Sequence, residues 1–455
     1  MNYRGAKKVL VIGAGLAGSD ASYFLAERGV KVVLLEGKGQ RLNPAQKITT
    51  SAELVCTNSL KSMNPDAAHG MLKYEMAGLG SLMLQIAQQT AVPAGDALAV
   101  DRVLFSQKIH DVLQNHENIQ LISEEVGDPL AAAEKYDCDY TIVASGPLTS
   151  AALEKWILSH VSQDDFYFYD AIAPVVDGES LDYSKLYYKD RHKDIIAGEQ
   201  ADYLNAPLNK QEYEAFIGEL VRAEKVPAAN FEQLKYFEAC LPIDTMAARG
   251  VDTARFGCMK PIGLSSAGGE SYYAVVQLRR ENLLGSAFNL VGFQTRLTYK
   301  EQLRVFRMIP GLEQAQFMHL GSVHRNSFLN ARKLLNGDLS SKEFPRLFFA
   351  GQMTGVEGYT ESAAMGLYTG LQVLRRLNAE EEIVFPVTTA IGALVHYLMT
   401  VPKPGPTNIN FGLLPPVELN KEQRRDRKNR KRIKKHLAAQ RARLSFDRCK
   451  EEYHL

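Results

Sequence analysis

The glycine-rich segment near the N-terminus has the spacing of a turn that binds a dinucleotide pyrophosphate. Gly13, Gly15 and Gly18 follow an apolar run that begins at Lys8. In such a turn the first glycine allows a tight bend, the second lets the backbone approach the phosphates, and the third permits close packing of helix on strand. The N–H groups at the helix start then face the anion. The segment therefore predicts cofactor contacts from Gly13, Ala14, Gly15, Leu16, Ala17 and Gly18.

An acidic residue stands where this kind of fold needs one. Glu36 ends a second apolar run, residues 32–35, about 20 residues beyond the glycines, where an acid binds the ribose hydroxyls. Ala17, Ala21 and Phe24 have helical spacing between the two runs. The expected strand, turn, helix, second strand and acid thus occur in the order and spacing of a dinucleotide-binding unit. The acid favours binding of FAD or NAD over NADP.

Two cysteines have surroundings that suit chemistry. Cys56 lies in a polar loop with Thr57, Asn58 and Ser59 beside it and a lysine five residues on, an environment that can favour the thiolate. Cys240 is flanked by an acid and a proline turn. For both, the alternative is a small buried structural side chain.

Composition narrows the class of protein. The 455 residues are 45% hydrophobic, but no run of about 18 apolar residues occurs and the chain enters its first strand almost at once, so we expect a cytoplasmic protein without a membrane span. Five scattered cysteines without CxxC spacing predict neither a disulfide framework nor a zinc site, and the histidines show no ligand spacing, so no metal is expected. Cys449 is expected to be an ordinary surface thiol.

The net charge of +1 conceals a basic C-terminal region. Residues 421–443 contain twelve Lys or Arg and two acids. Such a run forms a basic helix or arm that contacts RNA, or it is merely a solvated terminus.

The remaining elements must position these groups. Leu72, Met76, Leu79, Leu82, Met83 and Ile86 predict a helix after the Cys56 loop, and residues 139–147 predict a buried strand that ends in a glycine turn. A second strand, glycine turn and helix start (residues 347–367) suggest that Gly351, Gly355 and Tyr359 also face the cofactor. We expect an α/β protein with a Rossmann-like FAD-binding domain from residues 1–165 and 306–405, an inserted α+β domain over residues 166–305, and a basic tail over residues 406–455.

Several stretches together give a family resemblance over nearly the whole chain. The chain resembles the TrmFO family of folate- and FAD-dependent tRNA (uracil-5-)-methyltransferases, whose FAD-binding domain is of the glutathione-reductase type. The resemblance is carried by residues 11–18, 52–60, 92–102, 170–174, 259–264, 276–279, 288–296 and 349–364.

The resemblance implies transfer of a one-carbon unit from 5,10-methylenetetrahydrofolate to C5 of a uridine, with FAD as carrier and NADPH or NADH as reductant. It implies that Cys56 adds to uracil C6 and that Cys240 acts as an acid/base or protecting group, although the two roles can be exchanged. Addition of a thiolate to the neighbouring C6 makes C5 the carbon of an enolate, and C5 thereby becomes a nucleophile. Tyr359 is implied to lie near the flavin and to stack on folate.

The sequence also departs from the family pattern. Thr57, Ala239 and Cys258 replace a usual serine, glycine and proline, and Gln46-Lys47 replaces a pair of histidines. The expected target is the T-loop uridine of tRNA, and these changes keep open the alternative of a uridine of 23S ribosomal RNA, which a paralogous group methylates. Two other hypotheses remain: a non-catalytic FAD-binding protein that interacts with RNA, and an ordinary FAD oxidoreductase of small molecules. Neither DNA nor a membrane is an expected partner.

Overall fold

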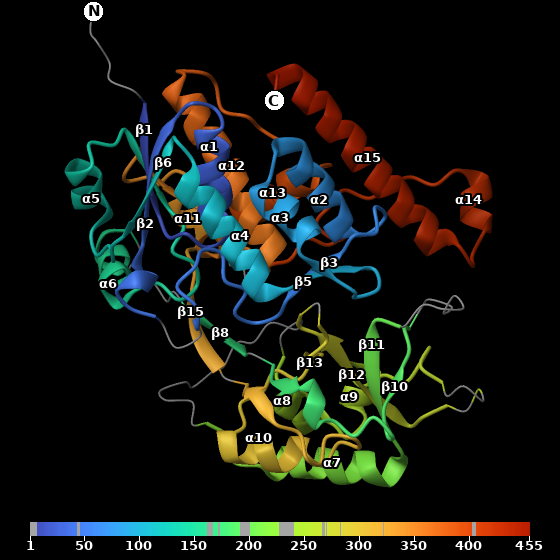
Figure 1. Ribbon diagram of the computed structural model, residues 1–455. Coiled ribbons are helices and arrows are strands. Elements are labelled where there is room, and N and C mark those ends of the chain that lie inside the picture. The colour runs from blue at the N-terminus through green and yellow to red at the C-terminus, as the bar shows by residue number, and fades with distance from the viewer. Residues whose placement is uncertain are drawn as a thin grey trace, which may run out of the picture.

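The computed structural model describes residues 7–42, 46–161, 167–171, 173–191, 201–226, 241–265, 269, 271–282, 284–321, 323–402 and 406–455. Two bodies are visible, one built around a parallel sheet and one around an antiparallel sheet (Figure 1). A two-stranded antiparallel ribbon, β8 (Tyr167–Ala171) with β15 (Val323–Ser327), lies between them.

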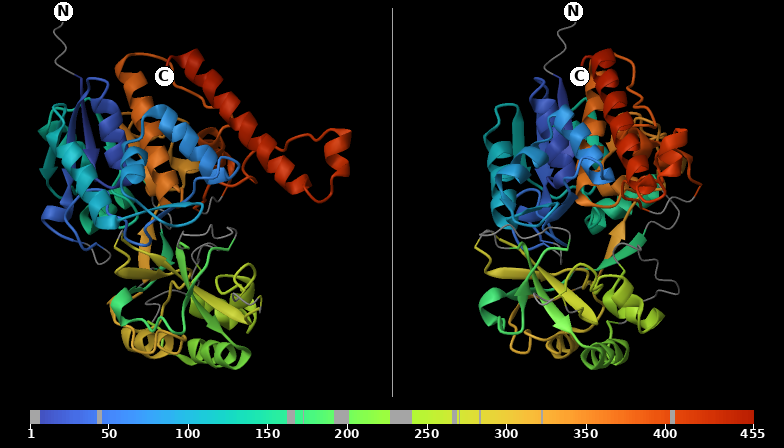
Figure 2. Two further views of the ribbon diagram at one scale, coloured as in Figure 1. Left: turned by 45° about the vertical axis from the view of Figure 1, so that its right-hand side comes forward. Right: turned by 90° about the vertical axis from the view of Figure 1, so that its right-hand side faces the viewer.

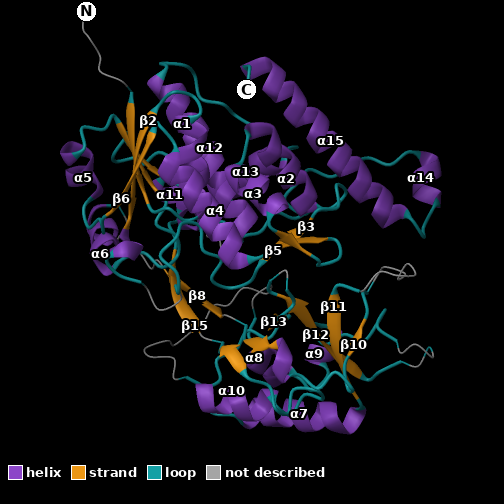
Figure 3. Cartoon of the chain, in the orientation of Figure 1, coloured by secondary structure: helices purple, strands orange, loops and turns teal. Residues whose placement is uncertain are grey.

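The parallel sheet forms from short, mostly buried apolar runs, except that the strand at one edge, residues 119–123, is partly exposed. Its order is β16-β7-β1-β2-β6, so the first strand of the chain lies in the middle. Helices α5 and α6 lie on one side of it, and α1, α4 and α12 lie on the other (Figure 3). The strands are β1 (Lys8–Ile12), β2 (Lys31–Glu36), β6 (Ile119–Ser123), β7 (Tyr140–Val143) and β16 (Leu347–Phe349). The helices are α1 (Leu16–Ala26), α4 (Arg102–Asn115), α5 (Pro129–Lys135), α6 (Ala151–His160) and α12 (Tyr359–Leu377).

The second body is the predicted inserted α+β domain. Its six-stranded sheet has the order β10-β11-β12-β13-β9-β14, and helices cover it (Figure 1). The strand β14 follows the expected boundary at residue 305 yet pairs with β9, so this domain continues up to the ribbon. The strands are β9 (Val175–Asp177), β10 (Tyr187–Tyr188), β11 (Tyr203–Leu208), β12 (Ala274–Arg280), β13 (Ala287–Leu290) and β14 (Phe317–His319). The helices are α7 (Lys210–Arg222), α8 (Ile243–Arg249), α9 (Thr253–Phe256) and α10 (Tyr299–Phe306).

The segment after the Cys56 loop differs from the single helix that we predicted. Gly80 adopts a left-handed conformation (φ 83°) and ends α2 (Ala68–Leu79), and the Ser81 hydroxyl then accepts the Leu84 N–H at 3.1 Å to cap α3 (Leu82–Gln89). Apolar spacing runs on through the break, which is why periodicity alone misses it. A small sheet of β3 (Ser59–Ser62), β5 (Ala97–Val100) and β4 (Ala91–Val92) lies beside these helices.

The basic C-terminal region is a helix rather than an extended arm. Beyond α11 (Ala331–Leu334) and α13 (Ala390–Thr400), the chain ends in α14 (Lys421–Arg425) and α15 (Arg430–Tyr453). The end of α14–α15 that begins at residue 421 projects from the molecule (Figure 2), while the last turns of α15 pack on α2. Cys449 is 3% exposed in that packing, so the prediction of a surface thiol was wrong.

The two bodies and their topology confirm the predicted α/β class with a Rossmann-like domain and an insertion. Within the ranges given above, no helix is both long and apolar enough to cross a lipid bilayer.

Candidate functional site

The glycine turn lies at the carboxyl edge of the parallel sheet, where open α/β sheets bind ligands. Gly13 has φ 100°, and a Cβ there would lie 2.7 Å from the Ala144 carbonyl oxygen. A Cβ on Gly18 would lie 1.8 Å from the Gly13 carbonyl oxygen, so this glycine is required for helix packing. A Cβ on Gly15 would meet nothing within 4 Å. Gly15 therefore leaves open space at the start of α1, where helix N–H groups and the helix dipole favour an anion.

Glu36 faces this turn from the end of the neighbouring strand. Its carboxylate accepts the Ala14 N–H at 2.7 Å and the Lys38 N–H at 3.0 Å. Both Glu36 and the glycine turn line a cavity of about 440 Å³. The carboxylate is thus fixed at the position where a dinucleotide ribose binds in this kind of fold.

The segment that follows β16 supplies a further part of the cavity wall. Gly351 (φ 71°) follows β16, and a Cβ there would lie 2.7 Å from the Ala17 side chain. Helix α12 packs closely on α1, because a Cβ on Gly366 would lie 2.1 Å from the Ala17 carbonyl oxygen. This contact brings Tyr359, the first residue of α12, to the cavity wall.

Cys56 and Tyr359 meet in the cavity wall. The Tyr359 hydroxyl accepts the backbone N–H groups of Cys56 at 2.7 Å and of Thr57 at 3.2 Å. Burial raises the pKa of Tyr359 well above its usual range, and nearby Cys56 adds to the rise while Arg102 opposes it. The phenol therefore stays neutral at physiological pH and holds the loop by its oxygen. The Cys56 side chain is partly exposed.

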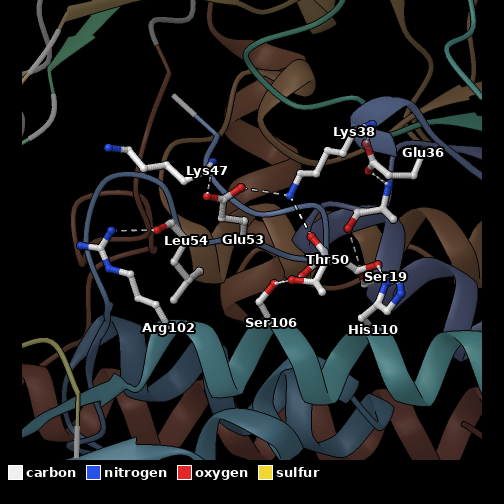
Figure 4. Close-up of polar contacts among 12 residues, drawn as sticks. Ser19, Glu36, Lys38, Lys47, Thr50, Glu53, Leu54, Arg102, Ser106 and His110 are labelled. Carbon is white, nitrogen blue, oxygen red and sulfur yellow. Dashed lines mark hydrogen bonds and ion pairs between the residues drawn. The ribbon is translucent and has the colours of Figure 1, made fainter. Parts of the chain in front are cut away.

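Charged groups fix the segment that joins Glu36 to Cys56. Lys38 bridges the Glu53 carboxylate at 3.2 Å and the Thr50 carbonyl oxygen at 2.9 Å, and the Lys47 N–H donates to Glu53 at 2.8 Å (Figure 4). Lys38 is 5% exposed, so its charge is largely shielded from water. A buried ion pair of this kind holds the chain in one conformation because either charge alone would be costly.

Arg102 supports the same loop from the start of α4. Its Nη1 donates to the Leu54 carbonyl oxygen at 3.0 Å (Figure 4), and its Nε lies 2.5 Å from the Glu281 carboxylate. Burial alone would lower the pKa of Arg102, but Glu281, with smaller contributions from Tyr359 and Cys56, raises it. A permanent cation therefore lies near the Cys56 thiol, where it favours the thiolate.

A contact from the inserted domain completes the site. Arg279 in β12 donates from Nε to the Asn58 side-chain oxygen at 2.9 Å and from Nη2 to the Thr57 hydroxyl. The Asn58 amide donates in turn to the Arg280 carbonyl oxygen at 2.9 Å. Sequence reasoning missed Arg102 and Arg279, although both lie in stretches that carry the family resemblance.

The cavity gathers most of the residues that the sequence singled out. Gly13, Gly15, Leu16, Ala17, Glu36, Cys56, Gly351 and Tyr359 line it. Ala14 and Gly18 lie directly behind the wall, in the contacts given above. Gly355 (φ 96°) is not part of the wall and instead ends the turn η4 (Gly351–Thr354). Cys240 lies outside the described residues. Across the described part of the chain, no three His, Cys, Asp or Glu side chains gather as a metal site.

Comparison with known proteins gives matches over most of the chain. The family model "Glucose inhibited division protein A" matches residues 8–381. A relative from Geobacter sulfurreducens is 49% identical over 93% of this chain and 95% of its own length, and one from Natranaerobius thermophilus is 47% identical over 96% and 97%. Both are named methylenetetrahydrofolate--tRNA-(uracil-5-)-methyltransferase TrmFO.

A solved structure is similar in fold. The form II crystal structure of Aquifex aeolicus GidA superposes with a TM-score of 0.67 and covers 99% of this chain and 74% of that one, at 18% identity. At this identity the likeness supports the fold alone.

Proposed function

Because the chain belongs to the TrmFO family, within the glucose-inhibited division protein A family, we propose that it is a folate- and FAD-dependent methyltransferase that acts on C5 of a uridine in tRNA. One observation carries this proposal beyond the family. The Cys56 loop and the dinucleotide-type glycine turn line the same cavity. A nucleophilic thiol and a cofactor cradle therefore share one reaction space.

The residues of the cavity fit FAD. The open space at Gly15 and the start of α1 suit the pyrophosphate, and the fixed Glu36 carboxylate suits the ribose hydroxyls. When bound, FAD carries the one-carbon unit of 5,10-methylenetetrahydrofolate, and NADPH or NADH supplies the electrons that reduce that unit to a methyl group. Tyr359 lies beside the Cys56 loop on the cavity wall, where its ring is available to stack on the folate.

The role that we assign to Cys56 is addition to the pyrimidine ring. Its thiolate forms a bond to C6, and the electron pair of the C5–C6 double bond moves to make an enolate, so that C5 attacks the one-carbon unit. A base then takes the C5 proton, and the bond between the one-carbon unit and its carrier would break with the electron pair leaving on the carrier. A hydride from the reductant would complete the methyl group, and the resulting enolate expels the thiolate from C6 as the C5–C6 double bond returns. We assign that base role to Cys240, and the two cysteine roles can be exchanged.

The basic C-terminal helix is a suitable contact for the RNA backbone. Ten Lys or Arg side chains between residues 421 and 435 are exposed, on the part of α14–α15 that projects from the molecule (Figure 2). Such a surface binds phosphates without reading sequence. It holds the RNA while the target base is splayed out of its loop into the cavity. We place the target in the T-loop of tRNA and the reaction in the cytoplasm.

The test is methyl transfer from labelled methylenetetrahydrofolate with added reductant. Unmodified tRNA and 23S ribosomal RNA fragments are offered separately, and the labelled nucleotide is mapped. We expect label on C5 of a T-loop uridine, with no label from a Cys56→Ala variant that still binds flavin and RNA. Label found only on ribosomal RNA would show that ribosomal RNA, rather than tRNA, is the substrate. RNA binding with no label on either RNA would instead favour a binding protein, and turnover of a small substrate without RNA would favour an ordinary oxidoreductase.

A further inference from the structure

Three consecutive residues of the inserted domain grip the Cys56 loop from both sides. Arg279 holds Thr57 and Asn58 directly after the cysteine, and the Arg280 carbonyl oxygen accepts the Asn58 amide. Glu281 pairs with Arg102, which holds the Leu54 carbonyl oxygen two residues before the cysteine. We call residues 279–281 the interdomain clasp.

Burial makes the clasp specific rather than incidental. Arg279 and Glu281 are each 7% exposed, and Asn58 is fully buried. Charged side chains are seldom this buried unless they are paired, because loss of one partner leaves an uncompensated charge in a low-dielectric region. Asn58 also donates to the Val100 carbonyl oxygen at 3.0 Å, so the clasp is tied to β5 of the neighbouring small sheet.

The clasp is one of several contacts between the two domains. The Tyr203 hydroxyl of β11 donates to the Ala94 carbonyl oxygen at 3.3 Å, and Asp202 accepts the Gly95 N–H. These contacts remain when the clasp is broken. A variant of the clasp is therefore expected to loosen the Cys56 loop without separating the domains.

We propose that Arg279 and Glu281 are positioning residues for Cys56, so that the inserted domain sets where the thiol lies in the cofactor cavity. This proposal rests on the proposed function, in which Cys56 adds to the uracil. Arg279 acts on the loop through Thr57 and Asn58, and Glu281 acts through Arg102. Neither side chain needs to touch the RNA base.

The experiment compares Arg279→Gln, Arg279→Lys and Glu281→Gln with wild type in the full-length protein. The first readout is the iodoacetamide alkylation rate of Cys56, followed by peptide mass spectrometry without RNA or folate, with Cys449 as the internal reference. We expect at least a threefold faster rate for Arg279→Gln and Glu281→Gln, because the released loop exposes the thiol. Arg279→Lys retains one donor and is expected to recover part of the protection.

The second readout separates positioning from binding. We expect kcat for methyl transfer to fall at least tenfold in Arg279→Gln, with KM for RNA within twofold of wild type. The matched control is Arg304→Gln, which removes an exposed arginine of the same domain that pairs with Glu301 and Glu219 and is expected to change neither readout. Unchanged Cys56 alkylation and kcat in the clasp variants would overturn the proposal.

A milder pair of variants keeps the proposal testable if Arg279→Gln fails to fold. Thr57→Val removes the acceptor of Arg279 Nη2 without burying a charge, and is expected to accelerate Cys56 alkylation by about threefold. Thr57→Ser retains the hydroxyl and is expected to keep the wild-type alkylation rate. Equal rates for Thr57→Val and Thr57→Ser would contradict the clasp. A wild-type protein that alkylates as expected but methylates nothing would refute the proposed function instead.

Discussion

Replacing Gly15 by alanine separates the folding role of the glycine turn from its binding role. Gly15 has φ −72°, which alanine adopts, and the added Cβ meets nothing within 4 Å. Gly→Ala at a compatible position stabilises a protein by about 0.4–1 kcal/mol, because the unfolded chain loses conformational freedom. We therefore expect flavin-free Gly15→Ala to be at least as stable toward urea as flavin-free wild type.

The same methyl group occupies the space that we assign to the pyrophosphate. Forcing an extra methyl into a filled site costs about 1–3 kcal/mol. That cost weakens the flavin Kd roughly 5- to 150-fold. Bound ligand stabilises a protein in proportion to the logarithm of its concentration over Kd. Saturating FAD should therefore raise the melting temperature of Gly15→Ala less than that of wild type.

The assay is titration of flavin-free protein with FAD, followed by fluorescence quenching and repeated by thermal melting. The matched control is Gly337→Ala, at an exposed loop glycine whose added Cβ also meets nothing within 4 Å. An unchanged flavin Kd for Gly15→Ala would refute the placement of the pyrophosphate. A loss of more than about 1 kcal/mol in the flavin-free protein would refute the open space at Gly15, since surface changes rarely cost more.

Three further predictions concern the Cys56 loop, the basic helix and the thiols of Cys138 and Cys449. Tyr359→Phe removes the acceptor of two backbone N–H groups, which costs about 1–3 kcal/mol for each group that no water molecule reaches. We therefore expect faster hydrogen exchange around Cys56 and a lower kcat, with flavin still bound. Neutralising four lysines and arginines of α15 should weaken RNA binding and lower its salt slope by about one per residue, measured by fluorescence anisotropy against salt; a wild-type slope would exclude this surface. Desolvation raises the pKa of Cys138 and of Cys449 to about 11. Between pH 7 and 10 the alkylation of both thiols should therefore stay slow and accelerate about tenfold per pH unit, as the thiolate fraction grows. A rate that stops rising below pH 9 for either thiol would contradict its raised pKa. The four substitutions that neutralise α15 in the RNA-binding test are Lys431→Gln, Arg432→Gln, Lys434→Gln and Lys435→Gln.

The glycine-turn wall of the cavity was predictable because its parts are contiguous. The turn from Gly13 to Gly18 and the acid Glu36 belong to one strand–helix–strand unit, so spacing along the chain is also spacing in space. The Gly351 turn and Tyr359 were placed by the same local signal in the second half. Cys56 was selected by its polar neighbours, and the cavity wall includes it.

The clasp was not predictable, because Arg279 and Asn58 are 221 residues apart and neither residue type is unusual. The Gly80 break was missed because apolar spacing continues across it, although glycine followed by serine is a stop-and-start signal for helices. The wrong prediction of a surface thiol at Cys449 could have been avoided from the sequence. Ala438, Ala442, Phe446 and Cys449 form a helical stripe among the charges, and all four are buried.

We propose that the Cys56 thiolate adds to uracil beside the bound cofactor. The most direct measurement offers the enzyme a tRNA in which 5-fluorouridine replaces the target, since fluorine at C5 cannot leave as a proton does and the thiol–C6 bond persists. Peptide mass spectrometry then locates the covalent RNA adduct. We expect the adduct on Cys56, and none there in Cys56→Ala. An adduct on a different residue of the wild-type protein, or methyl transfer by Cys56→Ala, would contradict the claim.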